Sequence, residues 1–141
     1  MKQKHRYNIK IAEKNNVQVQ IDDSKTSLDQ LLKLHQATVE RQKYKDRDST
    51  YISKVWETLN LNGKDLEDAP VTFIAKAVYK KKVLASWFLI GYKDTLYYPY
   101  GGSSDEFRNL MPTYLLVWEV VKFGATKGYK KLDLMGVLED K

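Results

Sequence analysis

The segment Tyr97-Tyr98-Pro99-Tyr100-Gly101-Gly102-Ser103-Ser104 is followed by Arg108-Asn109-Leu110-Met111-Pro112 and then by an apolar helical segment. It places three aromatic rings and a turn-forming Gly-Gly-Ser-Ser sequence at a junction between a strand and a helix, where α/β proteins often bind ligands. The tyrosines offer stacking faces and hydroxyl donors, and the glycines would let the backbone approach a substrate closely. We therefore expect this segment to contribute to a functional site.

The residues on either side of this segment predict antiparallel strands and a long helix. Strands are expected over residues 71–79, 83–91 and 95–100, because the short turns between them force antiparallel neighbours. A helix is expected over 111–126, with Gly128 as its stop signal, followed by a final strand over 131–137. Since this helix is apolar almost all round, we expect it to be covered on more than one side.

The first half of the chain predicts one strand and three helices. A short helix is expected over 7–14, and the strict alternation of 17–21 is typical of a strand with one buried face. Ser27 and Gln30 form a capping-box pattern that would open the next helix, and a further helix is expected over 50–59. One apolar stripe runs along the second of these helices and includes His35. A single histidine in such a stripe is more often a hydrogen-bonded core residue than a catalyst. The stripe consists of Leu28, Leu31, Leu32, His35 and Val39.

The composition fits one soluble globular domain of 141 residues, with 43% hydrophobic and 30% charged residues. The absence of cysteine rules out disulfides and thiolate metal sites. The first ten residues are basic and polar, unlike a signal peptide, so we expect a cytoplasmic location in a bacterium. The net charge of +6 has two possible explanations: basic residues on solvated faces of the protein, or a polyanionic partner such as RNA or a nucleotide diphosphate. Charge alone does not distinguish them.

The expected order, strand, two helices, three strands, helix, strand (β-α-α-β-β-β-α-β), resembles the α/β, mixed-sheet acyltransferase fold of the GNAT superfamily. That fold normally continues with one more helix and two strands. We therefore expect residues 17–141 to be an incomplete GNAT-like domain and residues 1–16 to be a linker helix from a preceding domain. GNAT enzymes that use acetyl-coenzyme A bind its pyrophosphate with an Arg/Gln-x-x-Gly-x-Gly/Ala loop before the long helix. Here the residues at 107–112 contain no glycine, and Pro112 lacks a backbone donor, which disfavours acetyl-coenzyme A.

Several strings resemble the FemABX family, the aminoacyltransferases that form peptidoglycan bridges. The fairly specific match is Tyr98-Pro99-Tyr100-Gly101-Gly102-Ser103-Ser104 through Arg108-Asn109-Leu110-Met111-Pro112, and weaker matches lie at 6–12, 38–41, 114–119 and 132–137. Members have two GNAT-like domains, and this chain looks like most of the second. The resemblance implies transfer of an amino acid from aminoacyl-tRNA, as co-substrate, to the stem peptide of a UDP-linked or lipid-linked muramyl pentapeptide. It implies no metal and no cofactor.

The resemblance also implies substrate-binding residues, although it identifies no catalytic residue. Arg47 and Tyr51 lie four positions apart at the start of a helix and match an Arg and a Tyr that contact the muramyl-peptide precursor in the family. Arg47 would pair with a diphosphate or a carboxylate, or it is a solvated charge near a helix N-terminus.

Three more residues are candidates for substrate binding. Tyr98 and Tyr100, two positions apart, are expected on one face of their strand, where they contact the stem peptide or sugar or belong to ordinary sheet packing. Arg108 would hold a precursor phosphate or pair with Asp105 or Glu119.

Two other functions stay open, a non-catalytic binding module and a GNAT-type N-acyltransferase that uses another acyl donor. An exposed sheet edge left by the missing strands would favour a homo-oligomer. The lipid-linked form of the acceptor would bring the protein to the inner face of the membrane as a peripheral contact.

Overall fold

The computed structural model describes residues 3–43, 48–62 and 69–134. Five strands form one sheet in the order β1-β2-β3-β4-β5, in which β1 to β4 are antiparallel neighbours and β5 runs parallel to β4. The strands are β1 (Gln18–Asp22), β2 (Val71–Tyr79), β3 (Lys82–Tyr92), β4 (Thr95–Ser103) and β5 (Lys131–Asp133). The helices are α1 (Gln3–Lys14), α2 (Lys25–Gln42), α3 (Ser49–Glu57), the π-helix η1 (Thr58–Asn62), the 3₁₀ turn η2 (Arg108–Leu110) and α4 (Pro112–Lys127). The predicted fold class and element order are confirmed, and the predicted strand at 131–137 is described only as far as Asp133.

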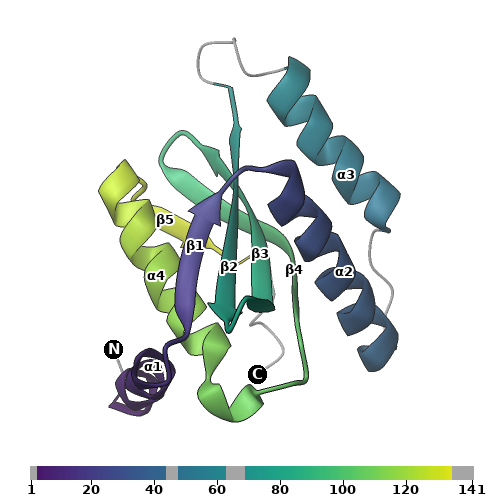
Figure 1. The fold of residues 1–141 in the computed structure, drawn as a ribbon. Coiled ribbons are helices and arrows are strands. Elements are labelled where there is room, and N and C mark those ends of the chain that lie inside the picture. Colours follow the sequence, from purple (N-terminus) through teal and green to yellow (C-terminus); the bar gives the residue numbers. More distant parts are fainter. Residues whose placement is uncertain (1–2, 44–47, 63–68, 135–141) are drawn as a thin grey trace.

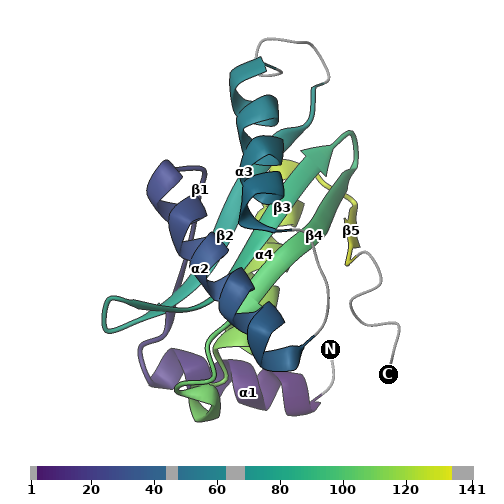
Figure 2. The same ribbon diagram turned by 90° about the vertical axis from the view of Figure 1, so that its right-hand side faces the viewer.

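The helices form two layers on opposite faces of the sheet (Figures 1 and 2). One face carries α2 and α3, and its core includes Leu28, Leu31 and Phe88, all fully buried. The other face carries α4, and α1 packs beside the first half of α4, where the His5 and Tyr114 rings meet at 5.6 Å between centroids. The prediction that the long apolar helix is covered on more than one side is therefore confirmed for its first half, whereas Val121 in the second half is 43% exposed.

The start of α2 lies three residues before the predicted capping box. Ser24 is the N-cap, and its hydroxyl accepts the Ser27 backbone N–H at 3.1 Å, so Ser27 lies in the first turn and is buried. The capping box at Ser27 and Gln30 is thus wrong, because the Gln30 side chain accepts a hydrogen bond from the buried Lys76 at 2.8 Å. Burial raises the pKa of Asp22, but Ser27, Ser24 and the Lys76 ammonium favour its charged form and leave the pKa below its ordinary value.

A bulge divides β4 into two halves. Phe88 pairs with Tyr100 and Ile90 pairs with Tyr97, so two residues of β4, Tyr98 and Pro99, lie opposite one residue of β3. A proline is tolerated at a bulge because no ladder hydrogen bond needs its missing N–H. The extra residue reverses the alternation of side chains, which puts Tyr98 in the core under α4 and Tyr100 in the core under α2. The prediction that these two tyrosines share one face is therefore wrong.

Candidate functional site

The Gly-Gly pair of β4 is part of a strand and not of a turn, because β4 continues to Ser103. A Cβ atom on Gly102 would lie 2.5 Å from both the His35 backbone nitrogen and the Leu34 carbonyl oxygen. A Cβ atom on Gly101 would lie 2.7 Å from the ring of Tyr98. Gly102 is therefore needed for the close approach of α2 to the strand. The space beside the two glycines, where a substrate was predicted, is filled by α2 at Gly102 and by the Tyr98 side chain at Gly101.

Hydrogen bonds fasten the end of β4 to α2. The Ser103 backbone N–H donates to the Thr38 hydroxyl at 3.0 Å. The Ser103 carbonyl oxygen accepts from both terminal nitrogens of Arg41 at 3.2 Å. The single hydrogen of the Thr38 hydroxyl is shared between the carbonyl oxygens of Leu34 at 2.7 Å and Ser103 at 3.1 Å. These bonds fix the part of α2 that carries His35 against the second half of β4.

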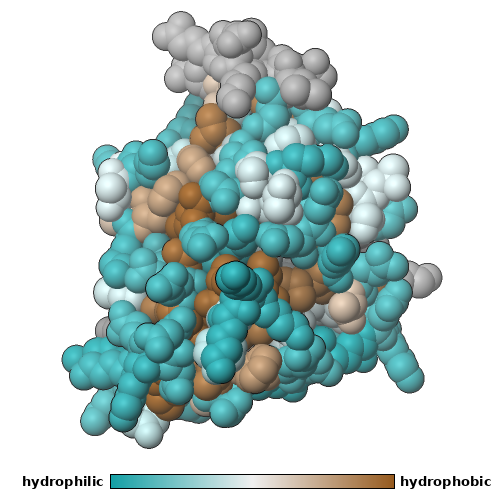
Figure 3. All heavy atoms as spheres, in the orientation of Figure 1, coloured by the Kyte–Doolittle hydropathy of each residue, from teal (hydrophilic) through white to brown (hydrophobic). Residues whose placement is uncertain are grey.

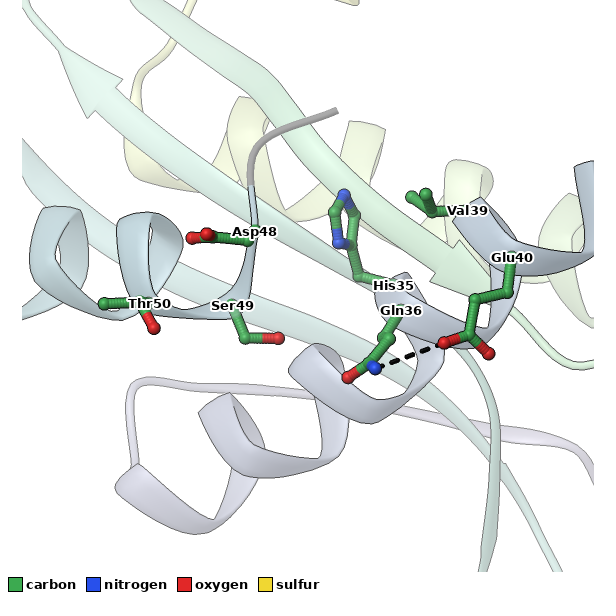
Figure 4. Close-up of a pocket in the computed structure, with 7 residues that line it drawn as sticks. All are labelled: His35, Gln36, Val39, Glu40, Asp48, Ser49 and Thr50. Atoms are coloured by element: carbon green, nitrogen blue, oxygen red, sulfur yellow. Dashed lines mark hydrogen bonds between the residues drawn. The ribbon is translucent and has the colours of Figure 1, made fainter. Parts of the chain in front are cut away.

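A cavity of about 340 Å³ lies between α2 and α3, beside His35 (Figure 4). It is lined by His35, Gln36, Val39 and Glu40 from α2 and by Asp48, Ser49 and Thr50 from the start of α3. Glu40 accepts a hydrogen bond from Gln36 at 3.2 Å, and the described part of the wall carries two carboxylates, those of Glu40 and Asp48. Carboxylates in such a wall attract an ammonium group, so this cavity suits an amine-bearing ligand.

His35 connects this cavity to β4. Its side chain is only 2% exposed, and its ring meets that of Tyr100 edge to face at 6.3 Å between centroids. Tyr100 in turn packs edge to face on Phe88 at 5.9 Å. His35 is thus a buried residue, as its place on the apolar stripe predicts, but it also lines the cavity and separates it from Tyr100.

Tyr51 lies on the outer side of α3, where its side chain is 44% exposed. It borders a second hollow of about 290 Å³, lined by Tyr51, Lys54, Val55, Thr58 and Leu59. Asp48 begins the helix by accepting the Tyr51 backbone N–H at 2.9 Å. Arg47, the residue before this cap, lies outside the described residues, so its predicted pairing with a phosphate or carboxylate stays a prediction.

The far end of α3 is held to the sheet by a polar network. Asp23 accepts hydrogen bonds from the Trp56 indole and from the Thr72 hydroxyl, both at 2.7 Å. Asn60 reaches the same Thr72 hydroxyl at 2.7 Å. This network positions α3, and with it Tyr51 and Asp48, relative to β2.

The structure separates the other predicted site residues from the cavity. Tyr98 is 9% exposed and stacks on Trp87, with ring centroids 3.8 Å apart and planes 11° apart, in the core under α4. Arg108 is exposed in η2, beside α1, and Glu119, one of its two predicted partners, pairs with Lys122 at 2.8 Å. The structure therefore brings Tyr51 and Tyr100 to the side of the sheet that carries the cavity, whereas Tyr98 and Arg108 lie elsewhere. Their roles in binding stay predictions.

Sequence reasoning missed the polar lining of the cavity. Gln36 and Glu40 are four residues apart on α2 and flank the stripe that contains His35, but solvent-facing positions of a helix have the same spacing. Asp48 precedes Ser49 and Thr50 as an N-cap does, which is a signal for a helix start and not for a ligand. Only the packing of α3 beside α2 identifies these residues as one site.

The start of α4 offers little for a bound pyrophosphate. Its N-cap is Met111, which has a left-handed backbone (φ 55°) and makes no side-chain capping bond, and Pro112 follows in the first turn without an N–H. Among the described residues no group of three His, Cys, Asp or Glu side chains could hold a metal ion. No helix in the described ranges has the length and apolar character needed to cross a membrane.

Three solved structures illustrate the likeness of this fold to known proteins. The FemX structure has a TM-score of 0.75 at 15% identity, over 94% of this chain and 48% of FemX. The C-terminal domain (DUF2156) of a putative lysylphosphatidylglycerol synthetase from Agrobacterium fabrum has a TM-score of 0.69 at 11% identity, over 94% of this chain and 40% of that chain. An aminoglycoside acetyltransferase from an uncultured soil metagenomic sample, in complex with sisomicin, has a TM-score of 0.59 at 15% identity, over 91% of this chain and 82% of that chain.

These likenesses establish a FemABX-like version of the GNAT fold, and the chain spans about half the length of FemX. No curated protein matches the sequence. Residues 1–140 match the family described as the acetyltransferase (GNAT) domain. Because this match covers nearly the whole sequence, the chain belongs to the GNAT acetyltransferase domain family and is an acyltransferase domain.

Proposed function

We propose that this chain is most of the second GNAT-like domain of an aminoacyltransferase that acts in cell-wall synthesis. The reaction would move an amino acid from aminoacyl-tRNA to the stem peptide of a UDP-linked or lipid-linked muramyl pentapeptide. The observation that carries the proposal is the likeness to FemX over 94% of the chain, with a TM-score of 0.75. The aminoglycoside acetyltransferase covers nearly as much of the chain, but its TM-score is 0.59.

The cavity between α2 and α3 is the proposed site of the acceptor peptide. Transfer of this kind needs an amine held close to an ester carbonyl, so the protein must above all align its two substrates. The carboxylates of Glu40 and Asp48 would attract the acceptor as an ammonium ion before it loses a proton. Tyr51, on the adjacent exposed side of α3, supplies a ring and a hydroxyl to the rest of the precursor.

Two features support an acyl donor other than coenzyme A. The connection before α4 contains no glycine, and the first turn of α4 begins with Pro112 after an N-cap that makes no side-chain bond. A diphosphate bound there would meet fewer backbone donors than at an ordinary helix start. The proposed donor is aminoacyl-tRNA, with no metal or cofactor, in a bacterial cytoplasm.

The alternative within the family is a GNAT N-acyltransferase with another acyl donor, and the specific observation in its favour is the aminoglycoside acetyltransferase match, which covers 82% of that chain. A non-catalytic binding module is the other alternative, because this chain spans only about half of FemX. We also propose that residues 1–16 link a preceding domain to this one. Pairing of two copies through the open edge of the sheet stays a prediction.

A calorimetric titration tests the function. The 141-residue chain is titrated with UDP-linked muramyl pentapeptide and, separately, with acetyl-coenzyme A. Arg47→Ala and Tyr51→Ala should each weaken precursor binding by about 1 kcal/mol or more, roughly fivefold, as expected for a lost hydrogen bond to a charged group. Tyr92→Ala is the control, because Tyr92 is similarly exposed at 37% but lies at the end of β3.

The outcomes separate the three functions. Precursor binding that both variants weaken and the control does not supports the proposed site. Saturable binding of acetyl-coenzyme A with no heat from the precursor would show that the chain is an acetyl-coenzyme A enzyme instead. Precursor binding without transfer in an assay with aminoacyl-tRNA would favour the binding module.

A further inference from the structure

The net positive charge of this protein lies mostly at one end of the sheet. Three segments meet there, α1, the turn between β2 and β3, and the connection from β4 to α4 (Figures 1 and 2). Residues 3–14, 79–82 and 104–111 contain eight basic and three acidic residues, which leaves sixteen basic and fifteen acidic residues in the rest of the chain. Nearly all of the net charge of +6 therefore belongs to this end, which we name the basal surface.

Direct contacts make the basal surface continuous. The Tyr79 and Phe107 rings meet at 5.1 Å between centroids, and the Lys82 ammonium pairs with Glu106 at 2.5 Å. Leu110 in η2 belongs to the same buried cluster as Ile9 of α1, which joins the β4–α4 connection to the helix. The turn, the connection and α1 thus present one surface to a partner.

The outward side of α1 adds a stripe of cations to this surface. Arg6, Lys10 and Lys14 are spaced by four residues and are all exposed, and Tyr7 beside them is 65% exposed. The opposite side of the helix carries the buried Ile9 and is already packed. In the orientation of Figure 1, the lower left of the molecule, where α1 lies, is covered mostly by hydrophilic side chains (Figure 3).

Basic and aromatic residues at this surface have positive φ angles, which are unfavourable for residues other than glycine. Tyr79 pairs with Lys82, so Lys80 and Lys81 form a two-residue turn, and their φ angles of 49° and 68° identify it as type I′. Asn-Gly suits such a turn far better than Lys-Lys. Phe107 also has a positive φ of 57°, and its apolar ring is 43% exposed. Strained residues that display charge and an apolar ring to solvent indicate a binding surface.

We propose that the basal surface docks the protein on a membrane that contains anionic phospholipids. Net positive charge spread over one end of a molecule complements the field of such a membrane. Six of the eight basic residues are lysines, compact point charges that suit a diffuse layer of headgroups better than the planar arginine fork that reads individual phosphates. Phe107 and Tyr7 supply the rings that settle at a membrane interface. The inference does not depend on the proposed function, but it would favour a lipid-linked acceptor.

The test measures co-sedimentation of the 141-residue chain with vesicles of phosphatidylcholine alone and of an equimolar mixture of phosphatidylglycerol and phosphatidylcholine. The chain should bind the mixed vesicles only, and added salt should weaken the binding. Lys80→Asn with Lys81→Gly removes two charges and gives the turn its preferred residues. This double variant should bind about tenfold more weakly or worse, whereas its melting temperature should stay the same or rise. Phe107→Asn removes the exposed ring and introduces a residue that tolerates a positive φ, so it should also weaken vesicle binding.

The control is Lys93→Asn with Lys130→Asn at the opposite end of the sheet. Lys93 is matched to Lys80: both have a positive φ, 54° and 49°, and the ammonium of each lies 5.4 Å from the ring of the preceding tyrosine, Tyr92 or Tyr79. Vesicle binding that only the basal variants weaken supports the proposal. Equal weakening by the control, or no binding to mixed vesicles, overturns it. Binding of deacylated tRNA through Lys80 and Lys81, without vesicle binding, would also overturn it and assign the surface to RNA.

Discussion

Gly102→Ala is expected to lower the free energy of unfolding by about 2 to 4 kcal/mol. The new methyl group would lie 2.5 Å from the His35 nitrogen and the Leu34 oxygen, where about 3.4 Å is an ordinary contact. Because these atoms belong to the backbone of α2, no rotation of a side chain relieves the clash and the helix must move by about 1 Å. Overpacking of this kind costs about 1 to 3 kcal/mol. The movement also strains the bonds from Ser103 to Thr38 and Arg41, which adds about 1 kcal/mol.

Urea unfolding followed by circular dichroism measures this loss, and a thermal scan should show a fall of roughly 5 to 15 °C for a domain of this size. Gly124→Ala is the matched control, because its methyl group would meet Leu96 at 3.5 Å, an ordinary contact, near the C-terminal end of α4. Alanine in a helix should leave stability unchanged or raise it by up to about 1 kcal/mol. An unchanged unfolding midpoint for Gly102→Ala would refute the close packing of α2 on β4.

Three further changes test other parts of the fold. Gly91→Ala would place a methyl group 2.5 Å from the ring carbon that bears the Tyr129 hydroxyl, and because this end of a half-buried side chain can rotate away, a loss of about 1 kcal/mol or less is expected in urea unfolding. Asp48→Ala removes the cap of α3 and should cost about 1 kcal/mol in a thermal scan, whereas Asp48→Ser should restore most of it. The lowered pKa of Asp22 means that its carboxylate stabilises the fold fully above the unfolded pKa and that this contribution is lost as the pH falls through the folded pKa. Asp22→Asn should therefore lower stability near neutral pH but show a shallower loss below about pH 4, and an identical acid limb would contradict this.

The order of the elements could be predicted because its signals are local. Short turns at 80–81 and 93–94 fixed the antiparallel strands, and Gly128 ends α4 with φ 92°, as a helix stop does. The start of α2 at Ser24 was harder to predict, because the Ser27 hydroxyl, three residues later, could cap a helix in the same way. Only the burial of Ser27 distinguishes the two, and burial depends on the rest of the fold.

The candidate site could be predicted only in part. Tyr51 and Tyr100 do lie on the side of the cavity, but the sequence contained no sign that Pro99 sits in a bulge, because a bulge is a property of two paired strands. Without it, Tyr98 was expected beside Tyr100 and not against Trp87. The function of Gly102 was missed for a similar reason, since the helix that it accommodates is more than sixty residues away in the chain.

The bulge has a mechanical consequence for substrate binding. A strand with regular alternation can slide along its neighbour by two residues and present the same faces, but a bulge pins β4 to β3 in one register. Movement on ligand binding is therefore not expected in β4. It is expected in α3, whose single fully buried residue is Ile52 and whose contacts are mostly with α2 and η1. Hydrogen exchange should accordingly be fast in α3 and slow in β4, and a ligand that bridges the two helices should protect α3 first.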